Sequence, residues 1–345
     1  MITDDTLREG MQTPGFSFSK TEKLELAQLI SEAGIKRSLV SYPPAHRSEF
    51  DVTCDIVKKG FFSEVFGLGR TLKQDIDIIS ETGANISLHL PFKIDNLDFI
   101  VENIKYACTK DKLVEVGFVD IDIFGINEII KFCKRMEDTG VNVVQLPDTR
   151  GALYPEKIWN IIKSVKNATG IKIEAHCHND HGMAIANTVS AITAGSDYVD
   201  TTIFGTGERN GIADSITIAD YLAENGIENT INFDRLKKAY NYMYNLILKK
   251  IGLKFFVANI PIYGNNSGIQ TAGTHVAYDS VFEEKNYSVN VYTGKKMIME
   301  ILNNNEIKYD NKNLESIVSM IKDESARRGE VLNINDIIKI AGGFA

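Results

Sequence analysis

Residues 141–181, VNVVQLPDTRGALYPEKIWNIIKSVKNATGIKIEAHCHNDH, decide the predicted fold. A short apolar run, 141–146, ends in a polar turn. A helix-period stretch, 156–167, follows Pro155, which suits the first turn of a helix. A second apolar run, 171–175, then ends in another polar cluster. This order predicts a strand–helix–strand unit in which the two strands run parallel.

The same alternation recurs along the chain. Stretches at 20–33 and 128–139 also carry apolar side chains at helical spacing. The predicted strands are residues 2–6, 37–41, 62–67, 85–90, 113–118, 141–146, 171–175 and 198–203. Eight such units in about 250 residues are typical of a parallel (β/α)8 barrel, the TIM barrel of the α/β class. A doubly wound sheet would have fewer units and a glycine-rich turn after an early strand.

The pattern changes after Ile251. The following stretch is irregular, and helix periodicity returns only at 297–303, 314–327 and 334–340. We therefore expect a barrel domain at 1–254, an irregular linker subdomain at 255–292 and a small, mainly helical C-terminal subdomain at 293–345. Loops longer than about 12–15 residues are usually functional or disordered, so the linker is a candidate for covering a site.

Composition excludes several classes of protein. The 345 residues are 43% hydrophobic and 24% charged, as in an ordinary globular protein with a sizeable core. The net charge of −8 and the absence of Lys/Arg blocks argue against nucleic acid or an anionic membrane as partner. No apolar run approaches the ~20 residues of a membrane span, and the polar start does not resemble a signal peptide. Four scattered cysteines suggest no disulfide framework, so we expect a cytoplasmic location.

In a barrel of this kind, chemistry takes place at the carboxyl ends of the strands. His176 and His178 lie two residues apart at such an end, so their side chains share a face while Cys177 points away. Two histidines and one carboxylate can form a facial site for a divalent ion. We favour Glu9 as that carboxylate, because barrel closure brings the first strand near the seventh. The alternative is a packed or hydrogen-bonded histidine pair.

Arg8 and the segment 205–211 are two further groups that we expect near this metal site. Arg8 beside a metal can stabilise the enolate or oxyanion that develops when a carbon–carbon bond forms or breaks. Its alternative role is an ion pair with an internal carboxylate. Glu208 and Arg209 lie in GTGERNG, residues 205–211, whose glycines permit a tight turn. Whether that pair is functional or only braces the rim stays open.

These segments resemble those of metal-dependent condensing and cleaving enzymes: homocitrate synthase, 2-isopropylmalate synthase, citramalate synthase and hydroxymethylglutaryl-CoA lyase. The matching barrel segments are TLREGMQTPG (6–15), LPDTRGALYP (146–155), EAHCHNDHGMAIAN (174–187) and GTGERNGI (205–212). The matching tail segments are GNNSGIQTAG (264–273), YTGKKMIMEIL (292–302) and RRGEVLNINDIIKI (327–340). Glu9, where many relatives carry Asp, and Ile212, where isopropylmalate synthases carry Asn, favour the homocitrate synthase branch.

The resemblance implies roles for individual residues. Glu9, His176 and His178 match ligands of a divalent metal (Mn, Mg or Zn), and Arg8 matches the enolate-stabilising arginine. Substrate-pocket positions of the family are matched by Gln12, Arg70 and Thr149. The implied reaction is a Claisen-type condensation of an acyl-CoA, acetyl-CoA in the family, with a 2-oxo acid. The implied assembly is a homodimer with swapped C-terminal regions.

The sequence departs from the family at two positions that transfer protons and at one that binds the substrate. Val119 stands where the synthases carry a catalytic Glu, and Glu115 stands where homocitrate synthases carry an arginine for the distal carboxylate. Gln270 replaces a catalytic histidine, and a glutamine exchanges no proton near neutral pH. His275 is the possible replacement. Other candidate acids are Asp120 or Asp122 after a local shift, and Tyr278, Tyr287 and Tyr292.

Three functions follow from these observations. The favoured one is a divalent-metal-dependent acyltransferase that condenses an acyl-CoA with a 2-oxo acid. Because Glu115 replaces the gripping arginine, we expect 2-oxoglutarate not to be the best acceptor. The second is a metal-dependent aldolase or lyase that acts on a 2-oxo acid without CoA. The third is a catalytically inactive relative that binds metal and a 2-oxo acid.

Overall fold

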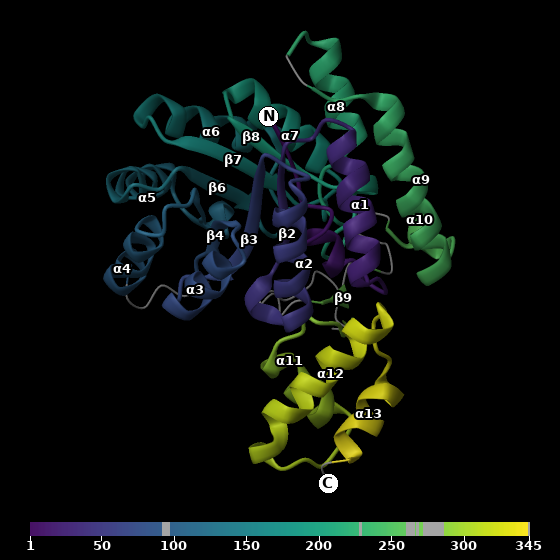
Figure 1. Cartoon of the computed structure of the whole chain (residues 1–345). Helices are drawn as coiled ribbons and strands as arrows, with labels where there is room; N and C mark the ends of the chain where they lie inside the picture. Colours follow the sequence, from purple (N-terminus) through teal and green to yellow (C-terminus); the bar gives the residue numbers. More distant parts are fainter. Residues whose placement is uncertain (92–96, 228–229, 260–265, 267–268, 272–285, 344–345) are drawn as a thin grey trace.

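The computed structural model describes residues 1–91, 97–227, 230–259, 266, 269–271 and 286–343. Eight parallel strands close into a barrel in chain order, and the last strand pairs with the first (Figure 1). The strands are β1 (Ile2–Asp4), β2 (Arg37–Ser41), β3 (Glu64–Arg70), β4 (Asn85–His89), β5 (Val114–Gly117), β6 (Val143–Asp148), β7 (Lys172–Cys177) and β8 (Tyr198–Thr201). The predicted (β/α)8 barrel is therefore confirmed.

Helices alternate with these strands and surround them (Figure 1). They are α1 (Lys20–Glu32), α2 (Arg47–Lys59), α3 (Lys73–Glu81), α4 (Leu97–Cys108), α5 (Ile126–Thr139), α6 (Pro155–Ala168), α7 (Ala184–Ala194) and α8 (Ser215–Glu224), followed by α9 (Phe233–Lys250) and α10 (Lys254–Ala258). A capping box begins α1, where Ser19 Oγ accepts from Glu22 N and the Glu22 carboxylate accepts from Ser19 N. None of the helices in the described ranges is long and apolar enough to cross a membrane.

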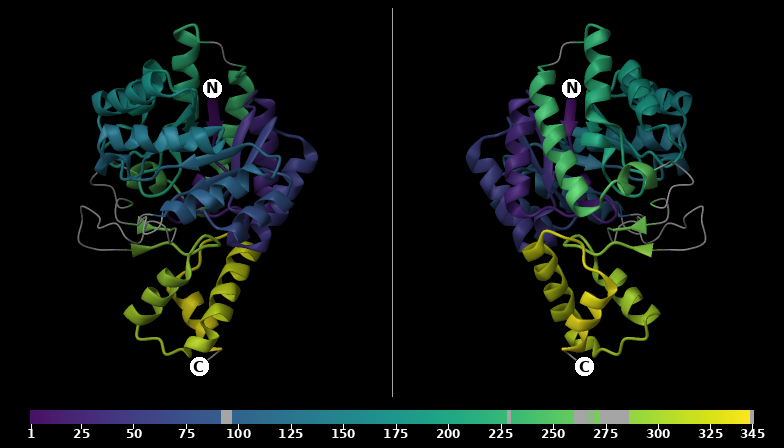
Figure 2. Two further views of the ribbon diagram at one scale, coloured as in Figure 1. Left: turned by 90° about the vertical axis from the view of Figure 1, so that its left-hand side faces the viewer. Right: turned by 90° about the vertical axis from the view of Figure 1, so that its right-hand side faces the viewer.

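The tail forms a second, smaller unit. Part of the linker is a two-stranded parallel sheet of β9 (Ile269–Gln270) and β10 (Asn286–Tyr287). Three helices follow: α11 (Lys295–Asn304), α12 (Leu314–Arg328) and α13 (Ile334–Gly342). They lie beyond one end of the barrel, with the linker strands between (Figure 2). The helical character of the tail is thus confirmed, while the division at 254 and 292 stays a prediction.

Several strands end elsewhere than predicted. β1 stops at Asp4 because Asp4 accepts hydrogen bonds from the backbone N and the hydroxyl of Thr6, which turns the chain. β6 and β7 continue further than predicted, up to the pair of Asp148 and Cys177. The polar residue His176 therefore lies inside a strand rather than after it.

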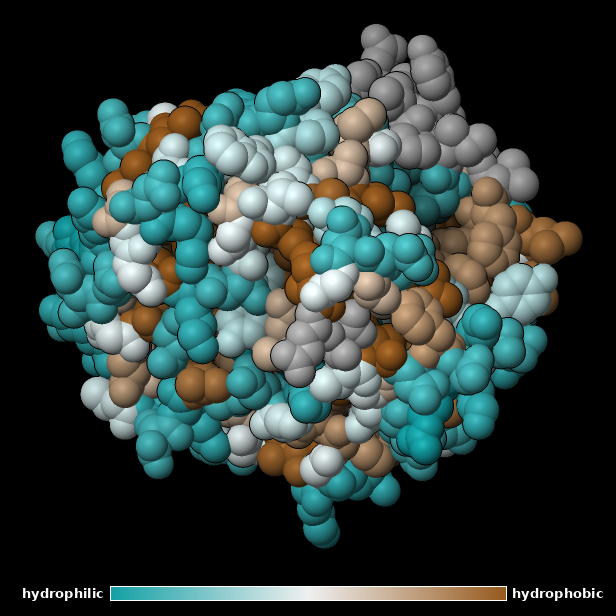
Figure 3. Space-filling view, turned by 90° about the horizontal axis from the view of Figure 1, so that it is seen from above, coloured by the Kyte–Doolittle hydropathy of each residue, from teal (hydrophilic) through white to brown (hydrophobic). Residues whose placement is uncertain are grey.

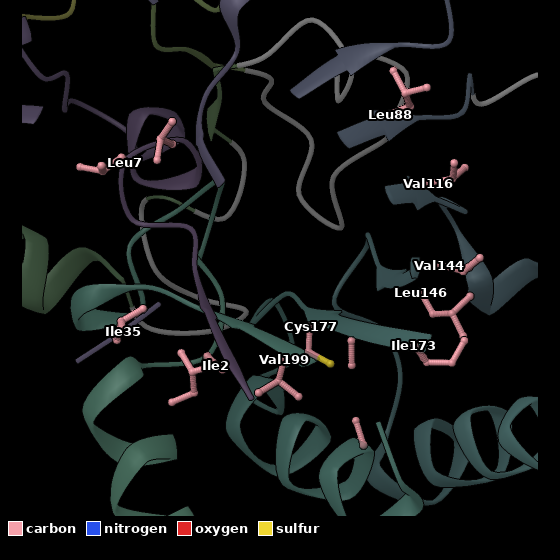
Figure 4. Packing of buried hydrophobic residues seen from close by; sticks show 14 of the residues in the cluster. Ile2, Leu7, Ile35, Leu88, Val116, Val144, Leu146, Ile173, Cys177 and Val199 are labelled. Atoms are coloured by element: carbon pink, nitrogen blue, oxygen red, sulfur yellow. The ribbon is translucent and has the colours of Figure 1, made fainter. Parts of the chain in front are cut away.

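Most apolar side chains of the strands face outwards, against the helices (Figure 4), while Leu39, Phe66 and Leu68 form a separate cluster. Residues of this layer include Leu88, Val116, Val144, Leu146, Ile173, Cys177 and Val199. A separate buried cluster holds the tail helices together around Met297, Ile317 and Ile337. At the end of the barrel away from the tail, hydrophobic residues lie scattered among hydrophilic ones (Figure 3). Cys177 belongs to the outward-facing layer, so its side chain points away from the barrel interior, as the strand alternation predicts.

The barrel interior is largely polar and is built around Arg37. Its guanidinium donates to Glu174 Oε2 (2.8 Å) and Glu64 Oε2 (2.6 Å) and pairs with Glu115, while Nε donates to Thr3 Oγ1 (3.0 Å). These partners belong to four different strands, so they meet inside the barrel. Burial and the charge of Glu174 raise the pKa of Glu115 to about 8, so this carboxyl is largely protonated at neutral pH. The network links the strands across the barrel.

Gly211 makes the loop after β8 possible. Its φ is +75°, and a Cβ there would lie 1.7 Å from the backbone oxygen of Gly205. The oxygen of Gly211 also accepts from Asn179 N (2.9 Å), which ties this loop to the end of β7. No side chain fits at this position without moving the loop.

We expect Gly211→Ala to lower the free energy of unfolding by about 3 kcal/mol or more, because left-handed strain and overpacking add. The matched control is Gly60→Ala, at φ +63° with no atom within 4 Å of the added Cβ, which should cost only about 1–2 kcal/mol. Denaturant unfolding measures both values. Equal losses in the two variants would contradict the close packing at Gly211.

Candidate functional site

The loops after β1, β7 and β8 meet at the barrel end that faces the tail. After β1 the chain forms a short 3-10 helix, Glu9–Gln12. The backbone N of Glu208, after β8, donates to Glu9 Oε1 (2.8 Å), and His178 forms a backbone bridge with Ile212. Three of the polar clusters seen in the sequence therefore form one site.

The two predicted histidines converge. The Nε2 atoms of His176 and His178 lie 3.3 Å apart, and both side chains are buried. Bonds of about 2.0–2.1 Å from each nitrogen to one ion would span that separation. Burial lowers the pKa of His176 to about 4, so its imidazole is neutral at pH 7, as a metal ligand must be. The pair thus has the spacing of two ligands to one cation, and His176 has the required charge state.

Asp200 orients the first of these rings. Its Oδ2 lies 2.8 Å from His176 Nδ1 and also accepts from Gln145 Nε2 (2.7 Å). A proton on Nδ1 leaves the lone pair on Nε2, which is the atom that faces His178. Burial, followed by the charge of Glu174, raises the pKa of Asp200 well above its usual range.

Glu174, on β7, and Asp200, on β8, are both buried acids. Among the described residues, Oδ1 of Asp200 and Oε1 of Glu174 have no hydrogen-bond partner. Burial acts to raise the pKa of Glu174, but the charge of Arg37 outweighs it and the pKa is lowered. The charge of Glu174 instead acts with burial to raise the pKa of Asp200, so the two acids shift in opposite directions.

The predicted third ligand, Glu9, has two other contacts in this structure. Its carboxylate pairs with Arg8 and accepts from the backbone of Glu208. A group whose ligand atoms all lie within 4.8 Å of one another is instead formed by Asp5, His176 and Asp200. The Glu9 carboxylate still acts on His176, whose pKa it raises against the larger effect of burial. Whether Glu9 is a ligand is therefore left to experiment.

The charge balance of the site fits a divalent cation. Asp5, Glu9 and Asp200 surround the histidines, and Arg8 is the guanidinium beside them. Burial raises the pKa of Asp5 well above its usual range. Oxygen and imidazole ligands suit Mg²⁺, Mn²⁺ or Zn²⁺. Bound cationic charge would offset the cost of burying these carboxylates.

The predicted pocket residues lie at different depths. Gln12 is buried and donates to Glu208 Oε2 (3.1 Å). Thr149 is buried, and its Oγ1 accepts from Asp120 N (3.0 Å). Arg70 is 59% exposed in its side chain and is paired with Asp75. The structure therefore brings Gln12 next to the metal-site loops and leaves Arg70 at the solvent-exposed edge.

Glu208 and Arg209 both join separate segments. Glu208 Oε1 accepts from the backbone of Thr271 in the linker (2.9 Å). Arg209 pairs with Asp180 (2.6 and 2.8 Å) and donates to the backbone oxygen of Thr149. These contacts brace the rim, and Glu208 in addition anchors the linker over it.

The positions at which the sequence departs from the family have different surroundings in the structure. Glu115 lies deep in the barrel on Arg37, not at the mouth. Val119 is nearly buried, Asp122 is paired with Arg150, and Gln270 is buried near the site. His275 and Tyr278 lie outside the described residues. No titratable group occupies the positions of Val119 and Gln270 themselves.

Sequence reasoning missed His89 and Asp200. His89 ends β4, and its Nε2 lies 3.2 Å from Gln145 Oε1. Burial is the main cause that lowers its pKa to about 3, and the charge of Arg8 adds to this effect. The strand alternation of β8 puts Asp200 on the inner face, which is a signal that the sequence contains. His89 has no motif around it.

We expect His176→Ala and His178→Ala each to abolish tight binding of Mn²⁺ or Zn²⁺ in titration calorimetry. Asp200→Asn should weaken binding by about 10–100-fold, as loss of a residue that orients a ligand does. His181→Ala is the matched control, because His181 follows the pair but its ring stacks near Tyr154. If Asp5→Ala abolishes binding while His178→Ala does not, the ion belongs to the group of Asp5, His176 and Asp200.

The chain is similar to several known proteins. The HMGL-like family model matches residues 1–243. Homocitrate synthase of Sulfurisphaera tokodaii is 30% identical over 93% of this chain and 75% of its own length. 2-Isopropylmalate synthase of the same organism is 29% identical over 99% of this chain and 94% of its length.

Among solved structures, the HMG-CoA lyase of Bacillus subtilis has a TM-score of 0.64 at 17% identity, covering 71% of this chain and 92% of the lyase. That likeness shows the shared barrel fold. The family model covers most of the chain, including all eight barrel strands and every residue of the metal-site geometry described above. The chain belongs to the HMGL-like family.

Proposed function

We propose that this protein is a divalent-metal-dependent acyltransferase that condenses an acyl-CoA, acetyl-CoA in the first instance, with a 2-oxo acid. The observation that carries the proposal is the pair of Nε2 atoms 3.3 Å apart, with Arg8 and Glu9 on the adjoining loop. The similarity to synthases over nearly the whole chain, tail included, supports bond formation rather than cleavage.

The chain's own residues have distinct roles in this reaction. A divalent ion held by His176 and His178, with Glu9 as third ligand, would act as a Lewis acid on the oxo acid. Arg8 offers its guanidinium to the oxygen that becomes negative as the carbon–carbon bond forms. A base removes a proton from the acetyl methyl group, that carbon bonds to the carbonyl carbon, and the carbonyl oxygen takes up a proton to become a hydroxyl. Water then cleaves the thioester to give a carboxylic acid and the CoA thiol. The water-excluded setting of Arg8 strengthens its effect.

The charges near the site favour an acceptor with an uncharged side chain. Arg70 and Arg209, at the mouth of the barrel, each pair with a carboxylate of the protein. The distal carboxylate of 2-oxoglutarate would have to displace one of these partners. Glu115, at the position of the gripping arginine, is bound to Arg37. We therefore propose a 2-oxo monocarboxylate as the acceptor.

A metal-dependent aldolase or lyase without CoA is the second candidate, and one observation favours it. Neither Val119 nor Gln270 has a side chain that exchanges a proton near neutral pH. Asp122, a candidate only after a local shift, is held by Arg150. An aldol cleavage has no thioester to hydrolyse. Cleavage of a 4-hydroxy-2-oxo acid to pyruvate would identify this activity.

We also propose a homodimer with swapped C-terminal regions, which the resemblance implies. The scattered cysteines favour a cytoplasmic location, and His275, the one histidine of the tail sequence, is proposed as the replacement acid or base. His275→Ala tests the last point: unchanged turnover would exclude a role for this histidine. Sedimentation of the full chain tests the dimer.

We expect release of free thiol from acetyl-CoA when Mn²⁺, Mg²⁺ or Zn²⁺ is added with a short 2-oxo monocarboxylate. A panel of pyruvate, 2-oxobutyrate, 2-oxoisovalerate and 2-oxoglutarate, followed with a thiol reagent, measures it. The highest kcat/KM should not be that for 2-oxoglutarate, because the distal carboxylate finds no available arginine. No release across the panel by folded, metal-loaded protein would refute the acyltransferase.

In the same assay Arg8→Gln should lower kcat by about 10²–10³-fold, as loss of a donor to a developing oxyanion does. Arg150→Gln is the matched control, since Arg150 is a partly exposed rim arginine paired with Asp122. Equal activity of the two variants would remove Arg8 from the chemistry.

A further inference from the structure

The tail segment Ser288–Thr293 lies against the loop that carries Arg8 and Glu9. All six residues of the segment are buried. Asn290 Nδ2 donates to the backbone oxygen of Met11 (2.5 Å), and Gly15 N donates to Ser288 Oγ (3.2 Å). The tail therefore forms part of the wall behind the loop, and it does so on its own barrel.

Tyr292 connects this segment to a buried ion pair. Its hydroxyl donates to Glu49 Oε2 (2.6 Å), and both oxygens of Glu49 accept from Lys23 Nζ (2.8 and 2.7 Å). Lys23 is 1% exposed and Glu49 3%. A buried ion pair is stable only if its remaining hydrogen-bonding capacity is satisfied, and Tyr292 supplies one of these bonds. The tail thus completes a network that α1 and α2 of the barrel begin.

The same tyrosine lies within electrostatic reach of Arg8. Burial and Glu49 raise the pKa of Tyr292 well above its usual range, while the positive charge of Arg8 acts in the opposite direction. Its ring centroid is 6.1 Å from that of Tyr42, at the end of β2. Arg8 is itself buried, so its orientation depends on what packs behind it.

We propose that Tyr292 is a positioning residue of the barrel site: by joining the Lys23–Glu49 pair it fixes the tail against the Arg8–Gln12 loop and so holds the Arg8 guanidinium in place. The kinetic part of this inference rests on the proposed function, whereas the docking part does not. A guanidinium displaced by about an ångström loses much of its effect on a transition state, so positioning is expected to alter kcat more than KM.

The test is Tyr292→Phe, which keeps the ring and removes the hydroxyl. We expect kcat to fall at least tenfold, with less than a threefold change in the KM of the acceptor. Hydrogen exchange at the backbone amides of Glu9, Gly10, Met11 and Thr13, which are bonded within the loop, should rise at least fivefold. Tyr309→Phe is the matched control, a partly buried tail tyrosine whose hydroxyl donates to Asn303 Oδ1 (3.4 Å) away from the loop, and should change neither quantity.

Exchange separates the outcomes. Wild-type exchange in Tyr292→Phe overturns the proposal, whether or not kcat falls, because the loop is then fixed without the hydroxyl. If the wild-type protein turns over no substrate, the proposed function fails, and exchange alone decides the docking. If Tyr292→Phe does not fold, the double variant Lys23→Met and Glu49→Met serves instead. It removes the carboxylate that accepts from the Tyr292 hydroxyl and replaces the ion pair with apolar side chains, a change that is often neutral for stability. The proposal then requires faster hydrogen exchange at the same loop amides of this variant.

Discussion

The guanidinium of Arg37 is the interaction on which the barrel interior depends. It links β2 to side chains of β1, β3, β5 and β7, and it lies between the rings of Phe66 and Tyr198, 4.1 and 4.3 Å from their centroids. Removing one partner from a buried ion pair costs about 3–5 kcal/mol. Since Glu174 lies two residues before His176 on the same face of β7, this contact also sets where the histidines stand.

The side chains that line the barrel interior differ between the end away from the tail (the floor) and the end that faces the tail (the mouth). At the floor, Arg37 is balanced by glutamates, and Leu39, Phe66 and Leu68 form a small apolar cluster. Towards the tail, Asp5, Glu9 and Asp200 lie near the two histidines, of which His176 is neutral. Asp200 is linked to both layers, because it orients His176 and because the charge of Glu174 helps to raise its pKa. A cation at the mouth would thus be held by groups whose positions are fixed by contacts deeper in the barrel.

The fold could be predicted because each strand–helix unit carries its own local pattern. The histidine pair could also be predicted, since alternate residues of one strand share a face. The contacts of Asp200, His89 and Tyr292 could not, because they depend on the register and closure of the barrel. No pattern distinguishes Tyr292 from the other tail tyrosines; only its contact with Glu49, distant in sequence, does so. The end of β1 was missed because the side chain of Asp4 turns the chain.

The pairing of β1 with β8 has a consequence for biosynthesis. Ile2 pairs with Val199, so the first strand to leave the ribosome waits for the last before it gains its second neighbour. Contacts between residues so far apart in sequence form slowly. Glu9 therefore reaches its final surroundings only after Glu208 has been translated, and the tail contact of Met11 with Asn290 comes later still. All strands of the barrel are thus translated before the last part of the site.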